Sequence, residues 1–343
     1  MTPRARDPAG FAVACAGAAA GGGAAHALGF PAPFLTGSAT AVTLLALGGA
    51  PLHIPGLVRQ AAFLVLGIGI GTGVTPEVVS SLAEWPLSLA VLTASLAASL
   101  LAGSLLMERM GFDPLSAVLA ATPGHLSYVI GYATERGLDV PRIAVVQAMR
   151  VLLLTLLVPP LLVLWGEPGD AAVAALPPMS PLSLATLAGL GAAAGLALLR
   201  LRIPAALLLA GMCVSAVGHA TGLTPGVLPP WLALSAFALL GTLVGIRFRG
   251  VPLRIVQRAL AAGLAVTALT CGIAVAAMAL AVALTGLAPT LLLVAYAPGG
   301  VEAMAAMAVQ LGLAPAFVAA HHVARLLVLT VLVPAFLARR GRS

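Results

Sequence analysis

The chain has 343 residues, of which 61% are hydrophobic and only 8% are charged, and its mean hydropathy is +1.12. This composition excludes a soluble domain of this length, so the chain is expected to lie in a lipid bilayer. Its 17 basic residues are all arginines and outnumber 10 acidic residues, which gives a net charge of +7.

Apolar stretches of about 17–25 residues, long enough to cross a bilayer, recur along the whole chain. They predict six helical elements in each half. These are 11–29, 32–50, 57–75, 86–107, 114–134 and 141–165, and then 182–199, 203–219, 229–246, 258–285, 289–310 and 316–338. Prolines at most of the joints would end the helices there.

The second half of the chain repeats the first. At a fixed offset of 175 residues, 13 of the 37 positions in 123–159 are identical to those in 298–334. Both segments begin with Pro-Gly, and each carries an arginine at the same place, Arg150 in the first and Arg325 in the second. The chain is therefore interpreted as a tandem duplication.

The duplication defines the expected domains. They are a first membrane repeat at 11–165, a linker at 166–181 and a second membrane repeat at 182–338. In an apolar chain, such a repeat is typical of transporter folds whose substrate site lies between the two copies.

The first 25 residues have some features of a signal peptide, since two arginines precede an alanine-rich run. The repeat argues against cleavage. The partner of this segment, 182–199, lies in the middle of the chain, where no signal peptide can be. Residues 11–29 are therefore predicted to form a mature membrane helix.

The arginines indicate how often each repeat crosses the membrane. Fifteen of them are assigned to loops and tails. If all six elements of each repeat cross the membrane, only 7 of these 15 arginines lie on the same side as the N-terminus. If the fifth element instead enters the membrane and returns on the same side, all 15 arginines lie on the side of the N-terminus. Arginines concentrate in cytoplasmic loops, so five crossings per repeat are favoured. We expect a multi-pass protein of the cell inner membrane with both termini in the cytoplasm.

An odd number of crossings inverts one repeat relative to the other, as in many secondary transporters. The expected fold is an all-α polytopic membrane protein with two inverted repeats of about five transmembrane helices. The fifth elements, 114–134 and 289–310, would be re-entrant hairpins with a Pro-Gly pair at each tip, and the tips would meet near the midplane. In a simpler alternative each is one broken crossing helix, and a span is lost elsewhere in each repeat.

Small residues at helical spacing predict faces for close helix packing. They are Gly17/Gly21, Gly191/Gly195, Gly241/Gly245 and the alternating glycines from Gly67 to Gly73. Cys15, Cys213 and Cys271 show no pairing pattern and are interpreted as small buried hydrophobes. No metal-ligand spacing occurs, so neither a metal nor a cofactor is expected.

Several motifs resemble the AbrB-type integral membrane family. They are Ala-Thr-Pro-Gly-His-Leu-Ser (121–127), Arg-Gly-Leu-Asp-Val-Pro-Arg (136–142), Val-Gln-Ala-Met-Arg-Val-Leu-Leu (146–153), Ala-Tyr-Ala-Pro-Gly-Gly-Val-Glu-Ala-Met (295–304) and Ala-His-His-Val-Ala-Arg-Leu-Leu (320–327). The resemblance covers roughly residues 11–338 and departs at the first tip, where members often have Pro-Gly-Gly. It implies a duplicated membrane protein whose architecture looks like that of glutamate and bile-acid type sodium symporters.

Members of that family have been labelled regulators of gene expression or ammonia monooxygenases, and the residues here support neither label. A monooxygenase needs a metal cluster, and six scattered histidines with one membrane carboxylate do not make an evident one. A DNA-binding regulator needs a solvated basic motif, whereas the cytoplasmic arginines already explain the net charge. Neither enzymatic activity nor a nucleic-acid partner is expected, and an indirect effect on transcription stays open.

Arg150 and Arg325 each lie about 13–14 Å into an apolar helix, near the midplane, where an unpaired arginine costs at least ~2.5–3.5 kcal/mol. In a structural interpretation each binds exposed carbonyls at a broken tip. In a functional one the pair clamps an anionic substrate, and the two are compatible. The predicted substrate site combines these arginines with the tip residues Pro123, Gly124, His125, Ser127, Pro298, Gly299 and Gly300.

Glu302, His321 and His322 are the predicted ion-coupling residues. Glu302 follows the second tip near the start of a helix, where the helix dipole favours a carboxylate. It would either pair with Arg325 or Arg150, or bind a cation or proton. His321 lies four residues before Arg325 and so on its face. The histidines suggest proton coupling, although one of them could simply be a polar packing residue.

Together these residues favour a secondary transporter for a small anionic or zwitterionic metabolite, coupled to Na+ or H+. A helix that follows a tip presents free backbone N–H groups to an anion. The alternative is a membrane sensor that binds a ligand without moving it and affects gene expression indirectly. The expected partners are the lipid bilayer, the small-molecule ligand and the coupling ion, and the sequence does not indicate an oligomeric state.

Overall fold

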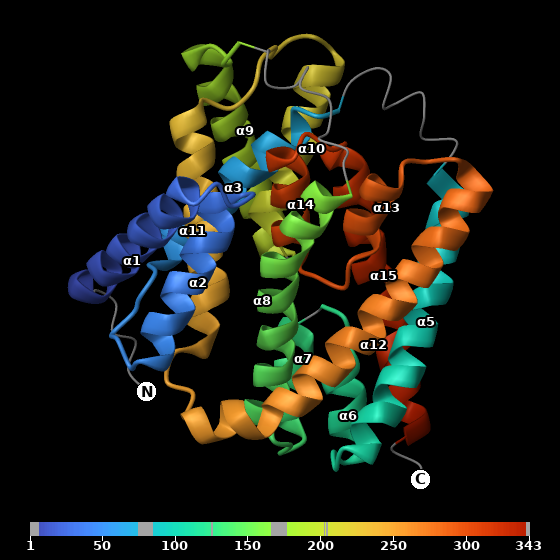
Figure 1. Ribbon diagram of the computed structural model, residues 1–343. Coiled ribbons are helices and arrows are strands. Elements are labelled where there is room, and N and C mark those ends of the chain that lie inside the picture. Colours follow the sequence, from blue (N-terminus) through green and yellow to red (C-terminus); the bar gives the residue numbers. More distant parts are fainter. Residues whose placement is uncertain are drawn as a thin grey trace. The chain divides into compact units, whose positions relative to one another are not determined.

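The computed structural model describes residues 7–74, 85–124, 126–165, 177–201, 203 and 205–340 (Figure 1). In these residues the regular structure is helical, apart from an isolated bridge between Pro178 and Val227. Seven of the described helices are long and apolar enough to cross a membrane, namely α1, α5, α8, α9, α11 with its 3-10 extension, α12 and α15. They indicate a multi-pass membrane protein.

Each predicted apolar stretch corresponds to a helix or a broken helix. The helices are α1 (Pro8–Ala27), α2 (Pro33–Leu47), α3 (Gly56–Gly71), α5 (Trp85–Arg109), α6 (Pro114–Ala121), α7 (Leu126–Glu135), α8 (Val140–Leu164), α9 (Pro181–Arg200), α10 (Ala206–Ala220), α11 (Pro230–Gly245), η3 (Ile246–Phe248), α12 (Leu253–Thr285), α13 (Pro289–Tyr296), α14 (Val301–Gln310) and α15 (Pro315–Arg340). The fifth element of each half is broken at its Pro-Gly pair, into α6 and α7 and into α13 and α14, as predicted.

The described residues group into two compact units, and each unit draws on both halves of the sequence. Unit 1 comprises Met1–Leu82, Thr155–Arg249 and Glu302–Ala319, and unit 2 comprises Ala83–Leu154, Gly250–Val301 and Ala320–Ser343. The units therefore differ from the sequence repeats at 11–165 and 182–338, whose limits stay a prediction.

In unit 1, glycines let helix backbones approach each other closely. A Cβ atom on Gly21 of α1 would lie 2.3 Å from the carbonyl oxygen of Gly37 of α2, and one on Gly67 of α3 would lie 2.1 Å from the carbonyl oxygen of Leu208 of α10. No side chain fits in such a gap, so these positions require glycine. The predicted small-residue faces at Gly21 and Gly67 are confirmed.

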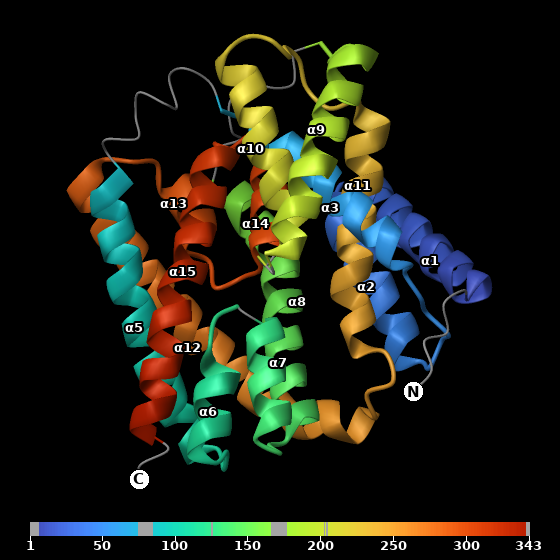
Figure 2. The same ribbon diagram turned by 180° about the vertical axis from the view of Figure 1, so that it is seen from behind.

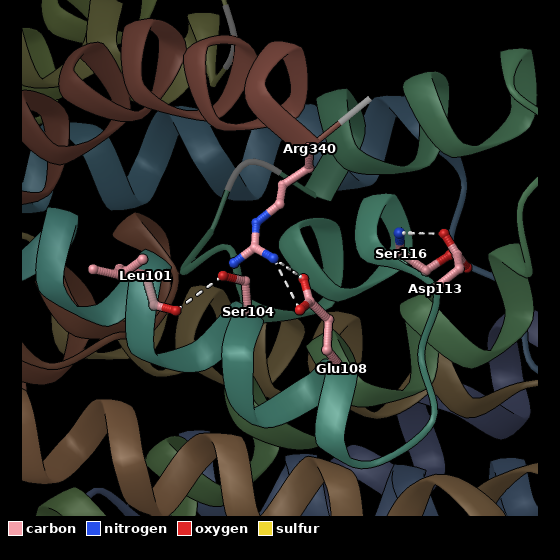
Figure 3. Close-up of polar contacts among 6 residues, drawn as sticks. All are labelled: Leu101, Ser104, Glu108, Asp113, Ser116 and Arg340. Atoms are coloured by element: carbon pink, nitrogen blue, oxygen red, sulfur yellow. Dashed lines mark hydrogen bonds and ion pairs between the residues drawn. The ribbon is translucent and has the colours of Figure 1, made fainter. Parts of the chain in front are cut away.

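In unit 2, the last turns of α15 pack against the α6–α7 pair. Their shared apolar cluster contains Leu100, Val118, Leu119, Val129, Ala133, Ile143, Leu329, Val333 and Leu337. At the end of the chain, Arg340 forms an ion pair of 2.6 Å with Glu108 at the end of α5 (Figure 3). The Asp113 carboxylate caps α6 by accepting the backbone N–H of Ser116 at 2.9 Å.

Helices α6 and α7 form a hairpin, because the start of α6 and the end of α7 lie together. Arg142, just beyond α7, donates to the carbonyl oxygens of Met110 and Gly111, just before α6, at 3.3 and 3.2 Å. Its guanidinium also lies 3.7 Å from the ring centroid of Phe112. The two ribbon views agree with this hairpin (Figure 2). Whether this broken element re-enters or crosses the membrane stays a prediction.

Candidate functional site

The break after α6 exposes carbonyl groups, and Arg150 of α8 binds them. Helix α6 ends at Ala121 with Thr122 as its cap, and Pro123 follows. Arg150 donates from Nη1 to the carbonyl oxygen of Ala121 at 3.3 Å and from Nη2 to that of Thr122 at 2.5 Å. Its side chain is fully buried. The positive charge therefore lies at the negative end of the α6 dipole.

Gln147, three residues before Arg150 on α8, completes this cap. Its Nε2 donates to the carbonyl oxygens of Leu119 and Thr122 at 2.8 and 3.0 Å. Its Oε1 accepts a hydrogen bond of 2.7 Å from Arg150 Nη2. Gln147 thus satisfies part of the helix end and also orients the guanidinium.

The break after α13 is capped in the same way by Arg325 of α15. Arg325 donates from Nη1 to the carbonyl oxygen of Ala297 at 2.6 Å and from Nη2 to that of Gly299. His322, three residues earlier, contacts the carbonyl oxygen of Val294 through Nε2 at 3.0 Å and contacts Arg325 Nη2 through Nδ1. Arg325 and His322 are both buried.

The two caps correspond at four positions at the offset of 175 and differ in the second carbonyl that each arginine binds, that of Ala121 or of Gly299. Arg150 matches Arg325, Gln147 matches His322, and the carbonyl groups of Leu119 and Thr122 match those of Val294 and Ala297. The structural interpretation of the two arginines is confirmed, since both bind carbonyls at a broken tip. A role as substrate clamp stays a prediction.

The first tip lies beside the helix that carries the second arginine. Gly124 has a φ of +99°, and a Cβ atom there would lie 3.9 Å from Cδ2 of Leu326, the residue after Arg325. Pro123, Pro298 and Gly299 are buried and Gly300 is half-buried. Unit 2 contains both arginines and the described tip residues, and a single site formed by all of them stays a prediction. His125 lies outside the described residues, as does the side chain of Ser127.

His321 points to a different group of residues from the one predicted. Its Nε2 lies 2.7 Å from the Ser88 hydroxyl of α5, and its ring lies beside those of Trp85 and Tyr296. The structure shows His322 in contact with Arg325. Spacing by four favours a shared helix face, but the long arginine side chain turns back toward the residue three positions earlier.

Sequence reasoning did not single out Gln147, Ser88, Trp85 or Tyr296. The signal for Gln147 was available, because it occupies the repeat position of His322 and precedes the arginine by the same three residues. The Tyr296 hydroxyl donates to the carbonyl oxygen of Ser88 at 2.5 Å and so joins α13 to α5. The two residues lie far apart in the sequence, and no local sequence pattern predicts their contact.

Glu302 belongs to unit 1, where it occupies the first turn of α14 as predicted and is half-buried. It interacts electrostatically with Arg247 of η3, in the same unit. Arg247 was assigned to a loop by sequence, yet η3 continues α11 directly and carries it. Pairing of Glu302 with Arg150 or Arg325 stays a prediction.

The described residues contain no group of three or more His, Cys, Asp and Glu side chains that could hold a metal ion. The three cysteines are free thiols. Cys213 is exposed and the other two are half-buried, so the prediction that all three are buried was wrong. A small apolar thiol can lie on the surface of a membrane helix because that surface faces lipid rather than water.

Comparisons with known proteins agree with the resemblance seen in the motifs. The family described as transition state regulatory protein AbrB matches residues 34–340. A protein of Escherichia coli (strain K12), provisionally named as the regulator AbrB, is 29% identical over 241 residues, or 68% of each chain. The uncharacterized protein YhjN of Bacillus subtilis (strain 168) is 27% identical over 293 residues, which cover 80% of this chain and 76% of YhjN. No solved structure matches. The chain belongs to the AbrB family.

Proposed function

We propose that this protein is a secondary transporter of the cell inner membrane that moves a small anionic or zwitterionic metabolite with Na+ or H+. The observation that carries the proposal is the pair of equivalent, buried, arginine-capped helix breaks. Broken helices in membrane proteins are found where the backbone lines a cavity or a binding site, because unpaired backbone groups are costly in lipid.

The charges around the first break favour an anionic group in the substrate. The hydrogen-bond partners of Arg150 are two carbonyl oxygens and an amide oxygen, which are all neutral. A buried guanidinium with neutral partners keeps its full positive charge, and a nearby anion would offset that charge. Each break is also followed by the start of a helix, α7 or α14, and a helix start favours anions.

In this proposal the two repeats are inverted and each crosses the membrane five times. Helices α2, α3 and α10 would cross with the seven longer ones, and the two broken elements would enter from opposite faces. The arginine distribution supports this arrangement, since all 15 arginines assigned to loops and tails then lie in the cytoplasm. At 15–16 residues, α2, α3 and α10 reach about 22–24 Å, so their flanking residues would complete the crossing.

Single cysteines test this topology. In a background without Cys15, Cys213 and Cys271, a cysteine at position 166 should react with an impermeant thiol reagent from outside. A cysteine at position 250 should react only from inside. Labelling of both from the same side would rule out the inverted arrangement.

Transport itself is tested with purified protein in liposomes, with candidate carboxylates and amino acids offered under an imposed Na+ or H+ gradient. Arg325→Lys should lose about tenfold or more of the uptake rate, because one ammonium cannot replace the two arms of the guanidinium. Arg258→Lys is the matched control, since Arg258 is exposed on α12 and should be replaceable. Glu302→Gln should change the pH or sodium dependence. Wild-type behaviour of both Arg325→Lys and Glu302→Gln would refute the site.

The names carried by the family and by its Escherichia coli member favour a second candidate, a membrane sensor that binds the same ligand without moving it. A thermal-shift screen separates the two candidates when it is combined with the uptake assay. A ligand at a hundred times its Kd stabilises the folded state by about 2.7 kcal/mol, whether or not it is transported. Stabilisation without uptake under any gradient would favour the sensor.

A further inference from the structure

Helix α7, which follows the first break, has an exposed face that the arginine cap does not use. Tyr128 and Tyr132 of α7 and Arg136, the residue after it, lie four residues apart and so share one side. The two tyrosine rings stack with their centroids 6.2 Å apart, and Cζ of Arg136 lies 5.3 Å from the centroid of Tyr132. Tyr128 is 37% exposed, and Arg136 is exposed as well. We call these three residues the α7 ladder.

The exposed residues of α7 are polar or small, unlike those of a helix that faces lipid. Beside the ladder, Gly131, Thr134 and Glu135 are exposed. On α15 of the same unit, the exposed residues include Leu327 and Val331, at 67% and 71%. An apolar exposed face suits lipid, whereas polar and charged groups at membrane depth face the protein interior or water. The exposed face of α7 therefore suits contact with water.

The equivalent helix of the second half does not have this face. At the offset of 175, the exposed positions of α7 correspond to buried positions of α14. Tyr128, Gly131 and Tyr132 match Ala303, Ala306 and Met307, and the last three are all buried. The exposed face is therefore a property of α7 and not of the repeat.

Two opposite charges lie where this face ends. Glu135 and Arg136 are both exposed, and within the described part of the chain neither side chain forms an ion pair or a hydrogen bond. Glu135 interacts electrostatically with Tyr128, while the Arg136 guanidinium lies over the ring of Tyr132. A guanidinium that stacks through its flat face keeps its N–H groups available for a carboxylate. The face thus presents one available positive charge and one available negative charge.

We infer that the exposed face of α7 is a water-filled approach from the cytoplasm to the first break and that it admits small zwitterions. Arg136 takes the carboxylate group of the solute. Glu135 and the tyrosine rings take its ammonium group, because a carboxylate and an aromatic face both attract a cation. A plain anion meets Glu135 as a repulsive charge. This inference rests on the proposed function and narrows its substrate class to zwitterions.

Single cysteines and membrane-impermeant methanethiosulfonate reagents test the approach in a background without native cysteines. Gly131→Cys and Thr134→Cys place a thiol on the exposed face, and a Cβ atom at Gly131 meets nothing within 4 Å. Both should react in inside-out membrane vesicles and not in right-side-out ones. Ala306→Cys, at the repeat position of Gly131, and Ala133→Cys, on the buried side of α7, are the matched controls and should stay unreactive.

The charge of the reagent tests the substrate class. An anionic sulfonatoethyl reagent is compared with a cationic trimethylammonium reagent, and each rate is divided by the rate with a free thiol in solution. At Gly131→Cys the two corrected rates should be about equal, because Glu135 and Arg136 offset each other. Arg136→Gln should lower the anionic rate about threefold, and Glu135→Gln should lower the cationic rate about threefold.

No reaction at either exposed-face cysteine would overturn the inference, as would reaction from the outside only. A preference of the parent protein for the anionic reagent of about tenfold or more would overturn the assignment to zwitterions. The measurement needs no substrate and no gradient, so its outcome is separate from that of the uptake assay. A protein that takes up a solute while these two cysteines stay unreactive would keep the proposed function and lose this inference.

Discussion

The two arginine-capped breaks share one backbone design and differ in the residue that supports the arginine. In both, a guanidinium binds the last carbonyls of a half-helix, and a residue three positions earlier holds that guanidinium. The supporting residue is Gln147 in the first break and His322 in the second. The Gln147 amide donates to two carbonyl oxygens and the His322 ring contacts one, and each side chain contacts the arginine through a second polar atom. The difference shows that two chemically distinct side chains can support the arginine of such a cap.

Removal of the arginines should have the largest effect, and the effect should be similar at the two breaks. Arg325→Leu leaves the carbonyl oxygen of Ala297 with the N–H of Gly299 and takes the donor only from Gly299. Arg150→Leu leaves Thr122 with the donor from Gln147 and takes the donor only from Ala121. An unsatisfied buried carbonyl costs about 1–3 kcal/mol, so we expect each variant to lose about 1–3 kcal/mol in the free energy of unfolding.

Denaturant unfolding in detergent micelles measures both losses. Arg258→Leu, at an exposed position, is the control and should change the free energy of unfolding little. If one arginine variant proves several kcal/mol more destabilising than the other, the count of carbonyl groups that lose a donor does not set the effect.

Substitution of the first tip should have a smaller effect. Gly124 has a φ of +99°, which favours glycine, so Gly124→Ala should cost about 1–2 kcal/mol. Gly131, in α7, is the matched control because a Cβ atom there meets nothing within 4 Å. Gly131→Ala introduces the residue found at the repeat position, Ala306, and should stabilise by up to about 1 kcal/mol. Thermal unfolding of the two variants should give shifts of opposite sign, and shifts of the same sign would contradict the backbone argument.

Exchange of the supporting residues should have the smallest effect. His322→Gln gives the second cap the side chain of the first, and Gln147→His does the reverse. Each replacement keeps an acceptor for the arginine and a donor for one carbonyl. Gln147→His removes a second donor from Thr122, which keeps the donor from Arg150. We therefore expect changes of about 1 kcal/mol or less, the net value of a typical hydrogen bond. Thermal unfolding of both single variants measures these changes. A loss of several kcal/mol in either one would show that the caps are not interchangeable and that the residue-by-residue correspondence is superficial.

Much of this arrangement could be predicted from the sequence. The duplication, the two Pro-Gly breaks and the two buried arginines follow from identity at a fixed offset and from charge placed within apolar stretches. The individual hydrogen bonds could not be predicted, because they depend on the rotamer of each side chain. His321 and His322 differ by one position along the chain, and only the packing of α13 and α5 places Ser88 beside His321 and Val294 beside His322.

The grouping of the helices into two compact units could not be predicted from the sequence either. Periodicity and proline positions locate helices, but they do not say which helices pack together. Unit 2 combines segments such as Ala83–Leu154 and Ala320–Ser343, which lie far apart in the chain. Contacts of this kind, such as the ion pair of Glu108 with Arg340, need a partner that no local pattern identifies.

The apolar cluster shared by the α6–α7 hairpin and α15 has a consequence for biosynthesis. Ala133 of the hairpin packs in one cluster with Leu337, about 200 residues further along the chain. At about 5–20 residues per second, a ribosome takes roughly 10–40 s to make that stretch. During this time the hairpin lacks its packing partner, although its two ends are already joined by Arg142. The hairpin must therefore be sheltered by lipid or by the insertion machinery until the last helix arrives, and a chain that stops before residue 329 would leave its apolar face uncovered.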